Sequence, residues 1–91
     1  MSATVRVLYL ARLREALGRA EEEITLEREG QTLDELIETL RRREGEFAKE
    51  LAQHRAWRVA VNHELVPASA LARPLAPGDE IAFFPPVTGG E

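Results

Sequence analysis

A single amphipathic helix, expected just after Gly30, limits the architectures open to this chain. Thr32 followed three residues later by Glu35 forms a capping box, which predicts where the helix begins. Acidic residues open the segment and arginines close it, as the helix dipole favours. The apolar residues recur at helical spacing and form one continuous stripe: Leu33, Leu36, Ile37 and Leu40. This stripe must be buried against another element of the fold.

Short segments with alternating polarity surround this helix and predict strands. Residues 4–10 and 80–84 are apolar on both faces, which is typical of interior strands. Residues 22–27 alternate apolar and charged side chains, which favours the edge of a sheet. The other predicted elements are strands over 57–62 and 64–66 and short helices over 11–17 and 46–53.

The order of these elements predicts the α+β class and the β-grasp, or ubiquitin-like, fold. In this fold one main helix covers a mixed sheet, and we expect segments 4–10 and 80–84 to lie side by side at its centre. A ferredoxin-like fold is the alternative, but it needs a second full helix after the third strand. Residues 67–79 contain three prolines and cannot supply that helix. We therefore expect a loop over 67–76 and a type II turn at Pro77-Gly78.

Length, charge and composition narrow the range of functions. The chain of 91 residues predicts one β-grasp domain over 1–84 and an extended, flexible tail over 85–91. A formal net charge of -4 disfavours nucleic-acid binding, because phosphate contacts need a basic face. There are no cysteines, so disulfides and thiolate chemistry are excluded. No apolar run approaches the ~20 residues of a membrane span, and the expected location is cytoplasmic.

The last nine residues, FFPPVTGGE, have an unusual order. Two aromatic residues end a strand, two prolines prevent its continuation, and two glycines without side chains follow. This order predicts an anchor, a stiff spacer and a thin tip that can enter a narrow passage. Phe83 and Phe84 cannot both face the core of an alternating strand, so we expect Phe84 to face a partner. The alternative is that local loops bury both rings.

Fold and tail together resemble the ubiquitin-like sulfur carriers, the MoaD/ThiS family. Within that family, the ending Phe-Pro-Pro-Val before Gly-Gly is most similar to small subunits of molybdopterin synthase. The matching segments cover almost the whole domain: Leu13 to Gly18, Leu33 to Leu36, Val61-Asn62, Leu75 to Glu80, and Phe84 to Gly90.

The resemblance implies a role for each residue of the tail. Gly90 would be the reacting group, because in such carriers an adenylating enzyme (MoeB-like) activates the terminal glycine carboxylate with ATP and magnesium. A sulfur donor then converts the acyl-adenylate to a thiocarboxylate, which the large synthase subunit (MoaE-like) uses in molybdenum cofactor biosynthesis. The carrier itself would bind no cofactor. The implied partner-binding residues are Phe84, Pro85, Pro86, Val87, Thr88 and Gly89.

Glu91 departs from the family pattern, because it turns the Gly90 carboxylate into an amide. Three explanations are open: proteolytic removal of Glu91, divergence without carrier activity, or activation of Glu91 itself. Other functions also fit the tail, namely a ubiquitin-like protein modifier, a sulfur carrier for thiamine or tRNA thiolation, and a non-catalytic interaction domain.

The remaining polar residues predict no catalytic centre in this chain. His54 and His63 lack metal-ligand spacing, so we expect both at the surface and no metal site. Residues 41–43 are expected to be a solvated helix end, and Trp57 a core residue. No nucleophile–base set stands out, so the chain is expected to act as the sulfur-donating subunit of a complex without an active site of its own.

Overall fold

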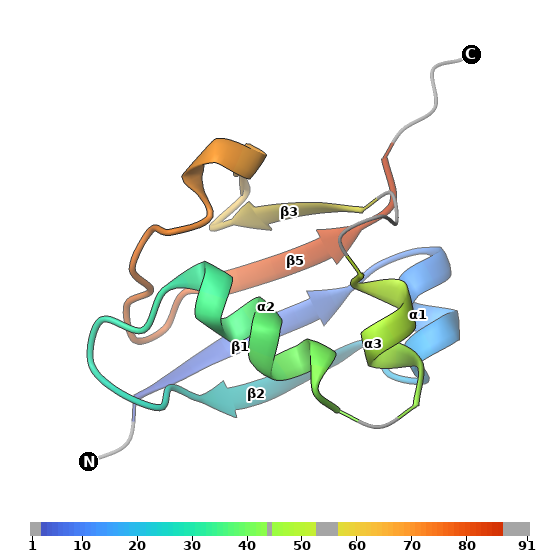
Figure 1. Ribbon diagram of the computed structural model, residues 1–91, viewed down its shortest axis with the longest axis horizontal. Helices are drawn as coiled ribbons and strands as arrows, with labels where there is room; N and C mark the ends of the chain where they lie inside the picture. Colours follow the sequence, from blue (N-terminus) through green and yellow to red (C-terminus); the bar gives the residue numbers. More distant parts are fainter. Residues whose placement is uncertain (1–2, 44, 53–56, 87–91) are drawn as a thin grey trace.

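The computed structural model describes residues 3–43, 45–52 and 57–86 (Figure 1). Within this part of the chain, one mixed sheet has the strand order β2-β1-β5-β3-β4, and α2 lies across one of its faces. This is the predicted β-grasp arrangement. In chain order the elements are β1 (Thr4–Tyr9), α1 (Arg12–Leu17), β2 (Glu21–Thr25), α2 (Leu33–Arg41), α3 (Glu46–Glu50), β3 (Arg58–Val61), β4 (Glu64–Leu65), the 3-10 helix η1 (Ala68–Ala70) and β5 (Glu80–Phe84).

The last of these strands, β5, occupies the centre of the sheet. It pairs in parallel with β1 and antiparallel with β3, so that Phe83 lies between Tyr9 and Val59. The prediction that the first and last strands lie side by side in the middle is therefore confirmed, as is the edge position of β2. Alternation along β5 buries Ile81 and Phe83 on the helix side and turns Ala82 and Phe84 to the other face.

Helix α2 supplies the layer that closes the core. The Thr32 hydroxyl accepts a hydrogen bond from the Glu35 backbone N–H at 3.1 Å, and the Glu35 carboxylate accepts one from the Thr32 N–H at 2.9 Å. This is the predicted capping box. Hydrogen bonds from Arg28 and from the Thr32 backbone lower the pKa of Glu35 below its usual value. Each residue of the apolar stripe is at most 1% exposed: Leu33, Leu36, Ile37 and Leu40.

Several segments differ from their predicted form, and the short helix expected over 46–53 ends at Glu50. The loop expected over 67–76 contains the short helix η1, because Pro67 can precede a helical turn whose first N–H groups have no partner within that turn. The strand expected over 22–27 is Glu21–Thr25 in the structure, one residue earlier in its start and two in its end. The turn at Pro77-Gly78 is present as expected: Gly78 has a φ of 86°, and the Asp79 N–H donates to the Ala76 carbonyl at 3.1 Å.

Aromatic rings pack against the end of β5 on the face of the sheet that α2 covers. The Phe83 ring, with no exposed surface, stacks on Tyr9 at a centroid distance of 6.1 Å and meets the edge of Trp57 at 5.8 Å. Tyr9 also contacts the Phe47 ring of α3 edge to face at 5.8 Å. Such pairs contribute roughly 0.5–1.5 kcal/mol each beyond their burial. Trp57 is half-buried and packs against the core, close to the predicted role.

The hydroxyl of Tyr9 belongs to a polar cluster at the sheet edge. It donates to Glu22 at 2.6 Å, and the same carboxylate accepts from Arg43 at 2.8 Å and Arg19 at 3.0 Å. Burial raises the pKa of Tyr9 well above its usual value, and the hydrogen bond to Glu22 adds to the rise. Burial alone would also raise the pKa of Glu22, but the hydrogen bonds from Arg43 and Tyr9 outweigh it, so the net pKa is lowered.

Replacing Glu22 with glutamine is expected to make the free energy of unfolding fall less steeply as the pH is lowered. The folded-state pKa of Glu22 lies below the unfolded value of about 4.3, so its stabilising contribution is complete above that pH. The contribution is lost as the pH falls through the folded-state pKa. Urea unfolding at a series of pH values should show that the free energy of unfolding decreases less with falling pH for Glu22→Gln than for the wild type. Glu15→Gln, at an exposed position of α1, should keep the wild-type slope. Equal slopes for wild type and Glu22→Gln would contradict this reading.

Candidate docking face and carrier tail

The carrier tail predicted from the sequence begins at the end of the central strand. β5 ends at Phe84, and Pro85 and Pro86 follow it without extending the sheet, since proline has no N–H to donate. Both prolines are half-buried. Val87, Thr88, Gly89, Gly90 and Glu91 lie outside the described residues. The predicted roles of these five residues therefore remain predictions.

We call the side of the sheet opposite α2 the outer face. Strand register assigns residues to it, because paired residues share a face: Leu8 pairs with Ala82, Ala82 with Ala60, and Ala60 with Leu65. Phe84 lies on the same face, half-buried, as the alternation of β5 predicted. Leu10, directly after β1, is 41% exposed, and Leu65 is 61% exposed. The outer face thus presents apolar side chains around the strand that carries the tail, which suits contact with another protein.

Charged pairs border this face along β1 and β2 and at the turn after β3. Arg6 donates to Glu21 at 2.5 Å, and the two side chains lie across the β1–β2 pair. His63, 84% exposed in its side chain, lies 3.6 Å from Glu80. The exposure of His63 agrees with its prediction, whereas His54 lies outside the described residues. An apolar centre with a charged border is typical of protein interfaces.

Backbone strain is present at the corner next to the tail. Ala11 has φ 54° and ψ -129°, a conformation that a residue with a Cβ rarely adopts. The corner is held on both sides: the Leu10 N–H donates to the Phe83 carbonyl at 3.0 Å, and the Leu13 N–H donates to the Leu10 carbonyl at 3.1 Å. The strained corner keeps Leu10 beside the end of β5.

Replacing Ala11 with glycine is expected to stabilise the protein by about 1 kcal/mol, because glycine adopts this conformation without steric cost. Ala11 is exposed, so no packing is lost. The free energy of unfolding from urea titration measures the gain. Ala72→Gly, at an exposed position of ordinary backbone conformation, should lower stability instead. A loss of stability in Ala11→Gly would show that the corner is not strained.

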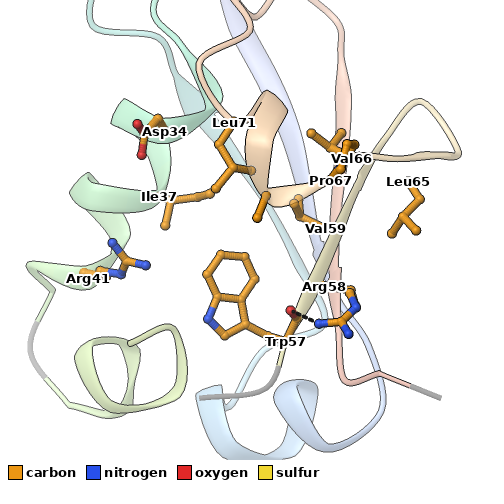
Figure 2. Close-up of a pocket in the computed structure, with 11 residues that line it drawn as sticks. Asp34, Ile37, Arg41, Trp57, Arg58, Val59, Leu65, Val66, Pro67 and Leu71 are labelled. Carbon is orange, nitrogen blue, oxygen red and sulfur yellow. Dashed lines mark hydrogen bonds between the residues drawn. The ribbon is translucent and has the colours of Figure 1, made fainter. Parts of the chain in front are cut away.

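A groove of about 690 Å³ lies between α2, β3 and η1. Figure 2 shows Trp57 at its centre, with Asp34 and Arg58 toward opposite ends. Sequence reasoning missed this groove, because its lining comes from segments far apart in the chain. The one sequence signal for this groove is Leu65, a large apolar residue in a short segment predicted to be a strand.

Within the described residues, no group of histidine, cysteine, aspartate or glutamate side chains could hold a metal ion. In the same ranges, no helix is both long enough and apolar enough to cross a membrane.

A β-grasp domain whose central strand leads into a proline-rich tail with two glycines defines the class of ubiquitin-like carriers. The model of the ThiS family matches residues 7–90. The chain therefore belongs to the ThiS family.

Curated relatives point to one branch of this family. The molybdopterin synthase sulfur carrier subunits of Escherichia coli (strain K12) and Haemophilus influenzae are 35% and 37% identical to this chain over 86 residues. Each comparison covers 94% of this chain and 99% of the relative.

Solved structures agree in fold. A Pyrococcus furiosus protein assigned as molybdopterin converting factor subunit 1 has a TM-score of 0.76 and 33% identity, covering 94% of this chain and all of that one. A chain in the complex of subunits 1 and 2 of molybdopterin-converting factor from Helicobacter pylori has a TM-score of 0.64 and 29% identity. That comparison covers 96% of this chain and 99% of the other.

Proposed function

We propose that this protein is the sulfur carrier subunit of a molybdopterin synthase, with its tail as the carrier arm and its outer face as the docking surface. One observation carries the proposal: the tail leaves the central strand of a β-grasp sheet, directly beside an exposed apolar face. The names of relatives that cover nearly the whole chain support it.

The tail has the reach that this function needs. From Pro85 to Gly90, an extended chain spans about 20 Å at roughly 3.3 Å per residue. The anchored end of β5 provides a rigid base, because Phe83 is enclosed by Tyr9 and Trp57. A rigid base and a slim tip together allow the chain end to enter a partner's active site while the domain stays docked outside.

The chemistry proposed for Gly90 proceeds in two balanced steps. A carboxylate oxygen of Gly90 attacks the α-phosphorus of ATP in the adenylating partner, and pyrophosphate leaves. Hydrosulfide, or an equivalent sulfur nucleophile, then attacks the acyl carbon, and AMP departs with its electron pair, leaving a thiocarboxylate. ATP and magnesium act in the partner, and this chain contributes the acyl group. In the synthase, the large subunit uses the sulfur.

Glu91 must be removed before this chemistry can start, because the amide carbonyl of Gly90 offers no carboxylate to activate. The family match ends at residue 90, which supports Gly90 as the working terminus. We propose that a protease cleaves the bond between Gly90 and Glu91.

Intact-mass spectrometry of the protein purified from its native host tests the proposal. The expected species ends at Gly90, and a fraction has one terminal oxygen replaced by sulfur. In vitro, the chain ending at Gly90 should gain this sulfur when incubated with its adenylating enzyme, ATP, magnesium and sulfide. Absence of the thiocarboxylate under all these conditions would refute the carrier function. Covalent ladders in cell extract that need Gly90 would instead identify a protein modifier.

A further inference from the structure

The groove beside β3 is continuous with the outer face, because two residues belong to both. Leu65 shares the outer face with Ala60 through strand pairing, and it also lines the groove. Arg58 lies opposite Phe84 in the sheet and lines the groove as well. A protein that covers Phe84 would therefore reach the groove across Arg58 and Leu65, and Figure 2 shows these two side chains at the groove.

The outer face alone is small for a stable interface. A specific interface covers roughly 800 Å² on each partner, with about 20–30 residues a side. The apolar side chains around Phe84 are few and include two alanines, so the docked domain gains further apolar contact only if the interface extends past them. Toward β2 the border consists of charges already paired, such as Arg6 with Glu21. Toward β4 the surface leads into the apolar groove, so extending the interface in this direction buries more apolar surface.

The groove stays open because β4 is short. Pro67 has no N–H to continue the ladder, and the chain turns away into η1. The pairing between β3 and β4 consequently covers only Ala60 and Val61, with one further hydrogen bond from the Val66 N–H to the Val59 carbonyl at 2.9 Å.

The side chains that line the groove indicate which kind of ligand would fit it. Ile37, Trp57 and Leu71 form apolar walls. Arg41 is engaged by its own fold, since it donates to the Leu51 carbonyl at 2.6 Å and lies 6.0 Å from the Trp57 ring centroid. Asp34 and Arg58, in contrast, have no ion-pair partner among the described residues. An occupant with an apolar side chain in the middle, an acidic group toward Arg58 and a basic group toward Asp34 would match this pattern.

We propose that this groove receives an extended segment of the large synthase subunit, with an apolar side chain against Trp57 and Leu71 and an acidic one at Arg58. The inference rests on the proposed function and extends its docking face around the edge of β3. The large subunit is the proposed partner because the similar Helicobacter pylori chain belongs to a complex of subunits 1 and 2 of molybdopterin-converting factor.

A matched pair of substitutions on η1 tests the groove. Ala68 is exposed and lines the groove, whereas Ser69 is exposed on the same short helix and does not line it. Ala68→Arg should place a long side chain in the groove and weaken binding of the large subunit by about tenfold or more, as loss of a buried contact does. Ser69→Arg should bind as the wild type does. Calorimetric titration with the large subunit from the same host measures both.

Two further measurements extend the test, and the second needs no substitution. Asp34→Ala leaves the groove open but removes its acidic end, and should weaken binding several-fold. Hydrogen exchange of the unaltered complex should show slower exchange across residues 66–71 than in the free protein. Equal affinity of Ala68→Arg and wild type, or unchanged exchange over 66–71, would overturn the groove proposal.

The outcomes separate this inference from the proposed function. If the wild type forms no complex with the large subunit, the proposed function fails together with the groove. If the complex forms and Phe84→Ala weakens it while Ala68→Arg does not, the docking face stands and the groove proposal alone is wrong.

Discussion

Phe83→Ala is expected to lower the free energy of unfolding by about 3–5 kcal/mol, a large part of the roughly 5–15 kcal/mol typical of a domain. The Phe83 ring has no exposed surface, lies in the central strand and contacts both Tyr9 and Trp57. Its removal leaves a cavity that neighbouring strands cannot fill without moving. Urea unfolding followed by far-ultraviolet circular dichroism gives the change.

Phe84→Ala is the matched control, because it removes the same ring from the next residue. Phe84 is half-buried on the outer face, so its loss should cost far less stability than the loss of Phe83. Under the proposed function, binding of the large subunit should instead weaken by about tenfold or more, as expected for an aromatic anchor at an interface. If both variants lost stability equally, the assignment of the two rings to opposite faces would be wrong.

Gly90→Ala, in protein ending at residue 90, is expected to slow thiocarboxylate formation by about 100-fold, since a small displacement at a reacting centre can cost that much. The added Cβ would widen the tip at the atom that must enter the adenylating site. This expectation rests on the proposed function, and the fold should be unaffected because the tail lies beyond β5. Rates come from single-turnover incubations analysed by intact mass.

Ala72→Ser in the same shortened protein is the control, because Ala72 is exposed and lies outside the tail. It should react at close to the wild-type rate. A Gly90→Ala rate similar to that of Ala72→Ser would show that the passage in the partner admits side chains at residue 90.

The sequence predicted much of the fold because single segments carry the decisive signals. The capping box and stripe define α2, and apolar residues on both faces of Glu80–Phe84 indicate an interior strand. The three prolines of residues 67–79 excluded a second long helix, which left the β-grasp as the best solution. The opposite orientations of Phe83 and Phe84 followed from alternation alone.

Features assembled from distant residues could not be predicted in this way. The groove needs Asp34, Trp57 and Leu71 to meet, and no local pattern reports on that. The cluster of Tyr9, Glu22 and Arg43 likewise depends on the packing of separate elements. The strain at Ala11 is equally invisible, because alanine is common in helices and usually gives no sign of a special turn.

The central position of β5 has a consequence for how the protein is made. β1 and β3 each have one edge without a partner until β5 enters between them, and β5 is the last of the described strands to be synthesised. Such long-range pairing forms late, after the intervening chain has been closed into a loop. On the ribosome, the sheet can therefore be completed only once residues 80–84 have emerged, so a chain terminated before them would lack both its central strand and the tail over 85–91. Translation order thereby couples the presence of the tail to the synthesis of every strand, so the tail never exists on a chain that lacks β5.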